Sequence, residues 1–106
     1  MARTPEGLVK DAVTKVLREF EAYYFFPVTG GFGHSGVPDI IACYRGFFIA
    51  IECKAGVGKL TALQDQQIEK IRKAGGAAIV VNEGTLGYVQ HTLETIETLH
   101  KFRSGT

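Results

Sequence analysis

The most apolar stretch of the chain, PDIIACYRGFFIAIECK (38–54), carries two acids and a base. Asp39 stands near its beginning, and Glu52 and Lys54 stand near its end. Because side chains alternate across a strand, Glu52 and Lys54 share one strand face, about 6.6 Å apart. A two-residue turn in the middle of the stretch places Asp39 opposite Glu52. The spacing therefore predicts two carboxylates side by side at a sheet rim, with a lysine close to them.

Such a constellation suits hydrolysis of a phosphate ester. Adjacent carboxylates repel each other, and a hard divalent cation relieves that repulsion. Mg²⁺ prefers oxygen ligands and keeps several waters, which leaves room for a phosphate. Lys54 can orient or help deprotonate the attacking water and can offset negative charge on a pentacovalent phosphate. The alternative is a rim salt bridge between Lys54 and either carboxylate, and the spacing alone leaves both interpretations open.

The bulk properties indicate one soluble domain. The chain has 106 residues, 45% of them hydrophobic and 22% charged, with a formal net charge of +1 that neither demands nor excludes a nucleic-acid partner. No apolar run approaches the roughly 20 residues of a membrane span, and the first residues lack a signal-peptide core. The two cysteines, Cys43 and Cys53, lie in apolar strand-like runs, so we expect buried free thiols and a cytosolic location. The absence of a CxxC pair and the scattered histidines make a structural zinc site improbable.

Hydrophobic periodicity predicts an α/β sandwich with element order αβββαβα and a central mixed sheet of about four strands. A parallel crossover is expected through the second helix, and a tight turn is expected at Arg45 and Gly46. The predicted elements are a helix over 5–23, a strand over 23–28, strands over 39–44 and 47–54, a helix over 61–74, a strand over 77–81 and a helix over 85–102.

Two glycine-rich segments match parts of nucleotide-binding motifs. GFGHSG (31–36) has the G-x-G-x-x-G pattern, but Pro38 and a strand follow it, where a dinucleotide site requires a helix. GVGKLT (56–61) ends like a phosphate-binding loop, but Cys53 replaces the first glycine and Leu60 replaces the final Ser or Thr. Neither segment is expected to bind a nucleotide in that way.

The order of the motifs resembles that of a nuclease family. Within GVPDII (36–41), VPD is followed after a gap of twelve residues by ECK (52–54), and a helix then opens with T-x-x-Q and ends near a glycine pair. An early glutamate in TPEGLVKDAVTKVL (4–17) also fits. This set resembles the VRR-Nuc (virus-type replication-repair nuclease) branch of the PD-(D/E)XK nucleases over roughly residues 4–82, and archaeal Holliday-junction resolvases are a close second resemblance. The resemblance implies a restriction-endonuclease-like fold and a single nuclease domain over residues 1–106.

The resemblance also implies a set of site residues. They are the metal ligands Asp39 and Glu52, the carbonyl of Cys53 as a third oxygen ligand, the catalytic Lys54, Gln64 from the second predicted helix and Glu6, also as a ligand, from the first.

Two of these residues have a second interpretation. Glu6 lies on the inward stripe of its helix, where a metal or its water would serve as a partner, yet a first-turn glutamate is also favoured by the helix dipole. Gln64 forms a capping box with Thr61 and could serve only that purpose. Ser35 and His34, in the glycine-rich loop (29–36), could contact a phosphate or be solvated, and the small residues of that loop would allow a sugar–phosphate backbone to come close.

These features predict an Mg²⁺-dependent (or Mn²⁺-dependent) endonuclease that cuts branched or four-way-junction DNA. The resemblance and the symmetry of a junction favour a homodimer. The compact form resembles viral members, which favours a phage origin and a location in the host cell cytoplasm. Two alternatives remain open: a nucleic-acid-binding module with the same fold but no turnover, and a small metal-binding or interaction protein.

A set of basic residues could line a DNA track, although such charges are usually only solvated. They are Lys10, Lys15, Arg18, Arg45, Lys59, Lys70, Arg72 and Lys73.

Overall fold

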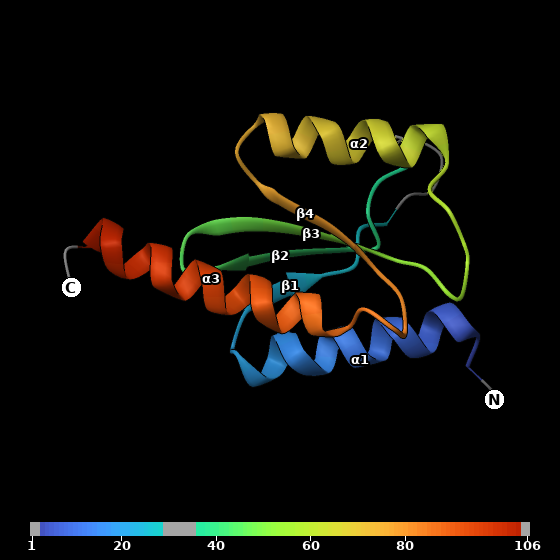
Figure 1. Cartoon of the computed structure of the whole chain (residues 1–106), viewed down its shortest axis with the longest axis horizontal. Coiled ribbons are helices and arrows are strands. Elements are labelled where there is room, and N and C mark those ends of the chain that lie inside the picture. Colours follow the sequence, from blue (N-terminus) through green and yellow to red (C-terminus); the bar gives the residue numbers. More distant parts are fainter. Residues whose placement is uncertain (1–2, 29–35, 105–106) are drawn as a thin grey trace.

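The computed structural model describes residues 3–28 and 36–104 and has the predicted element order (Figure 1). Its elements are α1 (Pro5–Glu19), β1 (Tyr23–Phe25), β2 (Ile40–Tyr44), β3 (Phe47–Cys53), α2 (Ala62–Lys73), β4 (Ala77–Val81) and α3 (Gly87–Ser104). The helix α2 lies on one side of the sheet, and α1 and α3 lie on the other (Figure 1). None of the described helices is long and apolar enough to cross a membrane.

The sheet has the strand order β1-β2-β3-β4, with β1 and β4 at its edges. β2 pairs antiparallel with β1 and with β3, and β3 pairs parallel with β4, so the predicted crossover through α2 is confirmed. The hairpin between β2 and β3 turns at Arg45 and Gly46, whose φ angles are 51° and 84°. Positive φ at both positions gives the two-residue turn that suits the twist of a hairpin.

The first helix ends earlier than the periodicity predicts. Thr4 caps its start by accepting a hydrogen bond from the Gly7 amide at 3.0 Å. Glu19 is its last residue, because Glu21 adopts a φ of 60° and Tyr23 already pairs with Cys43 in the sheet. The predicted helix over 5–23 is therefore wrong for its last four residues.

The two sides of the sheet are packed differently. The side against α1 and α3, here called the sealed face, holds the larger core, in which Leu17, Ile40, Ile51 and Leu93 are fully buried. Its strand residues are Tyr24, Ile40, Ala42, Tyr44, Phe47, Ile49, Ile51, Cys53, Ala77, Ile79 and Val81.

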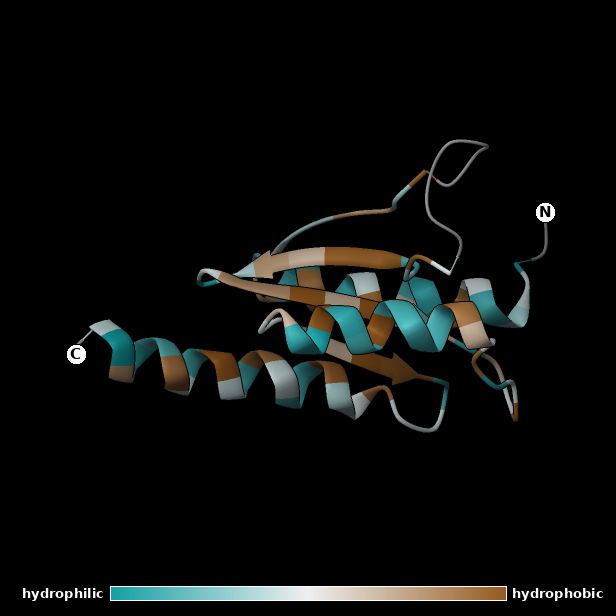
Figure 2. Cartoon of the chain, turned by 90° about the horizontal axis from the view of Figure 1, so that it is seen from above, coloured by the Kyte–Doolittle hydropathy of each residue, from teal (hydrophilic) through white to brown (hydrophobic). Residues whose placement is uncertain are grey.

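The side that carries α2, here called the open face, is only partly covered. Its strand residues are Tyr23, Phe25, Ile41, Cys43, Phe48, Ala50, Glu52, Ala78 and Val80, as the alternation of each strand and the register require. The buried Ile68 of α2 packs against Ala50 and Ala78, and in the view from above β2 lies to one side of α2 rather than beneath it (Figure 2). Tyr23, Phe25, Cys43 and Phe48 are consequently exposed.

Both cysteines are free, as predicted, but only Cys53 is buried. Cys43 is exposed because it faces the part of the open face that α2 does not cover, so the expectation of two buried thiols is wrong for Cys43. Arg72, one of the basic residues that could line a DNA track, is exposed and also contacts the sheet. Its guanidinium donates hydrogen bonds of 2.8 and 3.2 Å to the Ala78 carbonyl of the edge strand β4.

Candidate active site

Asp39 and Glu52 lie opposite each other at the rim where β2 begins and β3 ends. The register pairs Ile40 with Ile51, so the next pair outward is Asp39 with Glu52, as the turn length predicts. Asp39 Oδ2 accepts a hydrogen bond of 2.9 Å from the backbone N–H of Cys53, which fixes its carboxylate beside the end of β3. The hairpin therefore brings the two acids together through its own geometry.

Glu52 is a buried acid with an altered protonation equilibrium. Its side chain is 4% exposed, and Lys54 Nζ lies 3.6 Å from its Oε2. Burial, and then the negative charge of Asp39, raise the pKa of Glu52 from 4.5 to about 7, while Lys54 opposes this rise. The paired carboxylates and the rim salt bridge, which the sequence left as alternatives, thus coexist at one site.

Gln64 serves both of the roles considered for it. In the capping box of α2, its Oε1 accepts from the Thr61 N–H at 3.0 Å, while Thr61 Oγ1 accepts from the Gln64 N–H at 3.2 Å. Its Nε2 donates to Glu52 Oε2 at 3.2 Å. Because the cap holds the amide oxygen, the amide nitrogen is directed at Glu52, so α2 reaches the rim through this side chain.

Gly36 allows the chain before β2 to lie against the start of α2. Its φ is +79°, and a Cβ there would come within 2.5 Å of the Leu63 carbonyl carbon and 2.7 Å of the Gln64 nitrogen. The sequence suggested that this loop leaves space for a phosphate, but at Gly36 the space is filled by the backbone of α2. The only hint of this contact in the sequence is that Gly36 directly precedes the V-P-D segment. The rest of the predicted loop, including His34 and Ser35, lies outside the described residues.

The backbone and the side chain of Cys53 have different surroundings. Its backbone N–H holds Asp39, whereas its thiol lies in the sealed core. Burial, followed by the charges of Asp39 and Glu52, raises the pKa of the thiol to about 12; Lys10 lowers it and Glu6 adds a smaller rise.

Glu6 therefore acts electrostatically on the Cys53 thiol from the α1 side of the sheet. Its side chain is exposed rather than inward, and Val9 is the first buried residue of α1. The expectation that Glu6 faces inward is wrong in this respect. Its role as a ligand stays a prediction.

The carboxylates at the rim have the donor chemistry that a divalent cation requires. Among residues 3–28 and 36–104, the Cys53 N–H holds Asp39 through Oδ2, and Gln64 and Lys54 contact Glu52 through Oε2. In the same ranges, no three histidine, cysteine, aspartate or glutamate side chains gather closely enough to hold a metal ion together. Mg²⁺ commonly uses one or two carboxylates and completes its shell with water and substrate phosphate, so a pair of acids fits it.

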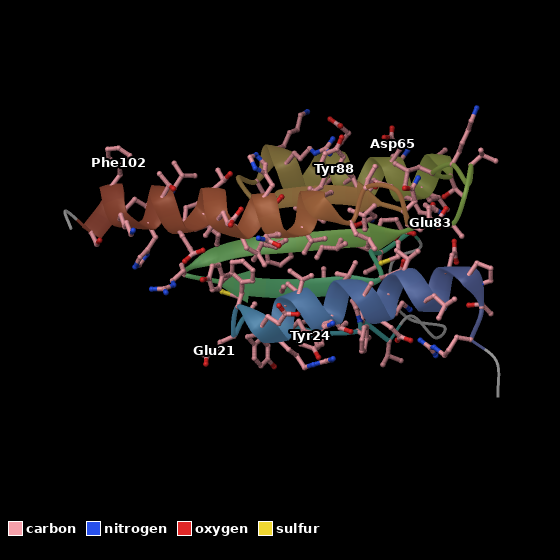
Figure 3. All side chains as sticks on the ribbon, turned by 60° about the horizontal axis from the view of Figure 1, so that its bottom comes forward. Glu21, Tyr24, Asp65, Glu83, Tyr88 and Phe102 are labelled. Carbon is pink, nitrogen blue, oxygen red and sulfur yellow. The ribbon has the colours of Figure 1, made fainter. Side chains whose placement is uncertain are left out.

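The loop after Lys54 is held by residues that the sequence did not single out. Gly56 N–H donates to Glu83 Oε1 at 2.6 Å, and Asn82 Nδ2 donates to the Gly56 carbonyl at 3.3 Å. Figure 3 shows Glu83 at the same end of the molecule as Asp65, in the first turn of α2. These bonds fix the segment that links Lys54 to α2. Gly56 is far in sequence from Asn82 and Glu83, so no local sequence motif predicts these hydrogen bonds.

The comparisons with known proteins concern the family and the fold of the chain. The family model described as "Archaeal holliday junction resolvase (hjc)" matches residues 21–103. A solved structure titled "VRR_NUC domain" has the same fold, with a TM-score of 0.69 and 23% sequence identity, over 87% of this chain and 97% of that one. No curated protein in the comparison matches the chain. The resemblance to VRR-Nuc domains is thereby confirmed for the fold and the resemblance to resolvases for the family: the chain belongs to the archaeal Holliday junction resolvase family.

Proposed function

We propose that this protein is a metal-dependent endonuclease that hydrolyses phosphodiester bonds in branched DNA, with four-way junctions as its main substrate. The observation that carries the proposal is the convergence of Asp39, Glu52 and Lys54 at one sheet rim, with Glu52 bonded to Gln64. The matching family is described as resolving Holliday junctions, which supports this class of substrate.

Asp39, Glu52 and the carbonyl of Cys53 would hold the metal, with Mg²⁺ as the ion and Mn²⁺ as a substitute. When bound, the ion supplies Lewis acidity and positive charge at the scissile phosphate. We include Glu6 in the proposed site as a contributor from α1 because the family resemblance implies it; its side chain is exposed.

The chain itself positions the reacting groups. Lys54 is held beside Glu52 at 3.6 Å and is only 12% exposed, so its ammonium lies at the rim instead of ranging through solvent. From there it can orient the attacking water and donate to a phosphate oxygen as negative charge develops. Gln64 holds the Glu52 carboxylate in one orientation through its capped amide.

We also propose a homodimer, because a four-way junction offers two symmetry-related scissile phosphates and a two-fold dimer can present one site to each. The free thiols of Cys43 and Cys53 support the cytosolic location expected from the sequence. Light scattering of the purified protein, alone and with a junction, tests the dimer. A single copy per junction would contradict it.

The activity is tested with labelled four-way-junction, flap and duplex DNA in Mg²⁺, in Mn²⁺ and in chelator. We expect cleavage of branched DNA with either metal and none with chelator. Asp39→Asn and Lys54→Ala should each reduce cleavage by about 10³-fold, because each removes a group that acts on the reacting atoms. Junction binding in chelator should persist in both variants.

Lys101→Ala, at an exposed position of α3, is the matched control for loss of one positive charge. It should cut at nearly the wild-type rate. Wild-type rates in both Asp39→Asn and Lys54→Ala would show that the chemistry occurs elsewhere, and full activity in chelator would remove the metal from the proposal.

A further inference from the structure

Three exposed aromatic side chains share the open face with the acidic rim. Tyr23 is 71% exposed, Phe25 47% and Phe48 46%. Tyr23 and Phe48 both lie opposite Cys43, one on each neighbouring strand, and the rings of Tyr23 and Phe25 are 6.4 Å apart. Single exposed apolar residues are ordinary on a protein surface, but these three lie on neighbouring positions of one face, with the exposed Cys43 between Tyr23 and Phe48. We call Tyr23, Phe25 and Phe48 the aromatic platform.

The register connects this platform to the rim in successive rows. Tyr23, Cys43 and Phe48 form the first row; Phe25, Ile41 and Ala50 form the second; Asp39 and Glu52 form the third. Each row is two residues from the next along the strands, or about 6.6 Å. The platform thus begins one row away from the carboxylates and continues away from them on the same side of the sheet.

The border of the platform is basic. Phe48 lines a hollow of about 280 Å³ together with Lys70, Ile71, Ala74 and Gly76. The last turn of α2 carries Lys70, Arg72 and Lys73. Aromatic rings flanked by lysine suit a chain of bases joined by phosphates, because every base has a π-face to stack and every phosphate attracts a cation.

We propose that the aromatic platform binds unpaired nucleotides next to the scissile phosphate by stacking bases on Tyr23, Phe25 and Phe48. The site would then favour branched DNA whose branch point exposes unpaired bases. This inference rests on the proposed function for its biological setting, but its binding step does not require cleavage. Continuity with the rim and the basic border favour nucleic acid over a purely apolar partner.

The test is binding of a fluorescein-labelled oligo(dT) twelve-mer, measured by anisotropy in chelator so that no cleavage occurs. Tyr23→Leu and Phe48→Leu remove the ring and keep an apolar side chain at an exposed position, so the fold should survive, and thermal melting checks this. We expect each variant to bind about tenfold more weakly, and the double variant about a hundredfold. The slope of affinity against salt should stay unchanged, because stacking releases no counterions.

Two controls separate stacking from other effects. Phe102→Leu removes an aromatic that is 82% exposed but lies near the end of α3, which covers the sealed side of the sheet (Figure 1), and should leave binding within twofold. Lys70→Gln should reduce the salt slope by about one, as expected for a lost phosphate contact.

The outcomes decide between the platform and its rivals. Unchanged binding in the double variant, or no binding of oligo(dT) by the wild type, would overturn the inference. So would a change from dimer to monomer in the Leu variants by light scattering, which would assign this surface to a second copy of the chain. Weaker binding in both Leu variants, with Phe102→Leu unaffected, supports the platform. If the wild type binds in this way but cuts no DNA, the proposed function fails and the platform stands.

Discussion

The sealed face and the open face of the same four-stranded sheet perform different tasks. The sealed face is covered by α1 and α3 and is almost wholly apolar, with Leu17, Ile40 and Ile51 fully buried. The open face carries one helix, a small apolar cluster around Ile68, and the acidic rim. Burial of apolar surface on the sealed face supplies the stability that lets the open face hold a buried acid and keep aromatic residues exposed.

The largest expected effect on stability comes from the sealed face. Leu17→Ala should lower the free energy of unfolding by about 2–5 kcal/mol, because it leaves a cavity in a tightly packed core. Leu63→Ala, at a half-exposed position of α2, should cost less than about 1 kcal/mol. Urea denaturation of both variants makes the comparison. Equal losses would mean that the two faces contribute alike.

The next largest loss of stability is expected from replacing Gly36, which lies against the start of α2 on the open face. Gly36→Ala should cost about 2–4 kcal/mol, because it combines a positive φ with a Cβ that meets the backbone of Leu63 and Gln64. It should also lower the cleavage rate of the folded fraction, since Gln64 would be displaced. Denaturant melts, together with cleavage measured well below the melting temperature, report the two effects.

Gly75→Ala separates close packing from backbone strain. Gly75 has a φ of +95° but no atom within 4 Å of the Cβ position, so only strain of about 1–2 kcal/mol is expected, with cleavage unchanged. If the two glycine variants behave alike, the contact between Gly36 and α2 is unimportant.

Local rules predicted the parts of the fold and the site that depend on neighbouring residues. The two-residue turn at Arg45 set the register that pairs Asp39 with Glu52, and the T-x-x-Q spacing set the cap of α2. The contact of Gly36 with α2 and the shared contacts of Glu52 depend on how elements distant in sequence dock.

The same limit explains two of the errors, at Cys43 and at the end of the first helix. Cys43 is exposed because α2 covers only part of its face, and the first helix stops at Glu19 because Glu21 turns with a positive φ. Strand alternation assigns a side chain to a face, but it does not say how much of that face a helix will cover.

Glu52 should make the stability of the metal-free protein depend on pH. Its pKa is raised in the folded state to about 7, so folding favours the protonated form. The stabilisation is fully present below about pH 4.5 and is lost as the pH rises through 7; the rise from 4.5 to about 7 corresponds to roughly 3 kcal/mol. Urea melts in chelator between pH 4.5 and 8 should therefore show stability falling with pH.

Glu52→Gln should remove this dependence, because the amide does not titrate, whereas Glu19→Gln, at an exposed position of α1, should leave it in place. A chelated wild-type protein whose stability stays constant or increases across this range would mean that Glu52 is not the titrating group. Added Mg²⁺ should restore stability at pH 8 by binding the ionised pair.

The smallest loss of stability is expected at the N-caps of α1 and α2, the two helices whose starts can be compared across opposite faces of the sheet. Thr4 caps α1 and Thr61 caps α2, and replacing either by Ala should cost about 1 kcal/mol, because each accepts one hydrogen bond from the first turn. The two should differ in cleavage. Thr61→Ala loosens the box that directs Gln64 at Glu52 and should lower kcat about tenfold with KM nearly unchanged, whereas the partner of Thr4 is the amide of Gly7, which has no side chain to direct.

Thr61→Ser keeps the hydroxyl and should restore kcat, which distinguishes orientation of Gln64 from a general loss of stability. Comparable losses of kcat in Thr4→Ala and Thr61→Ala would contradict that distinction and would place the start of α1, with Glu6, at the reaction as closely as the start of α2. The pair of variants thus tests whether the chemistry belongs to the open face alone or is shared across the rim of the sheet.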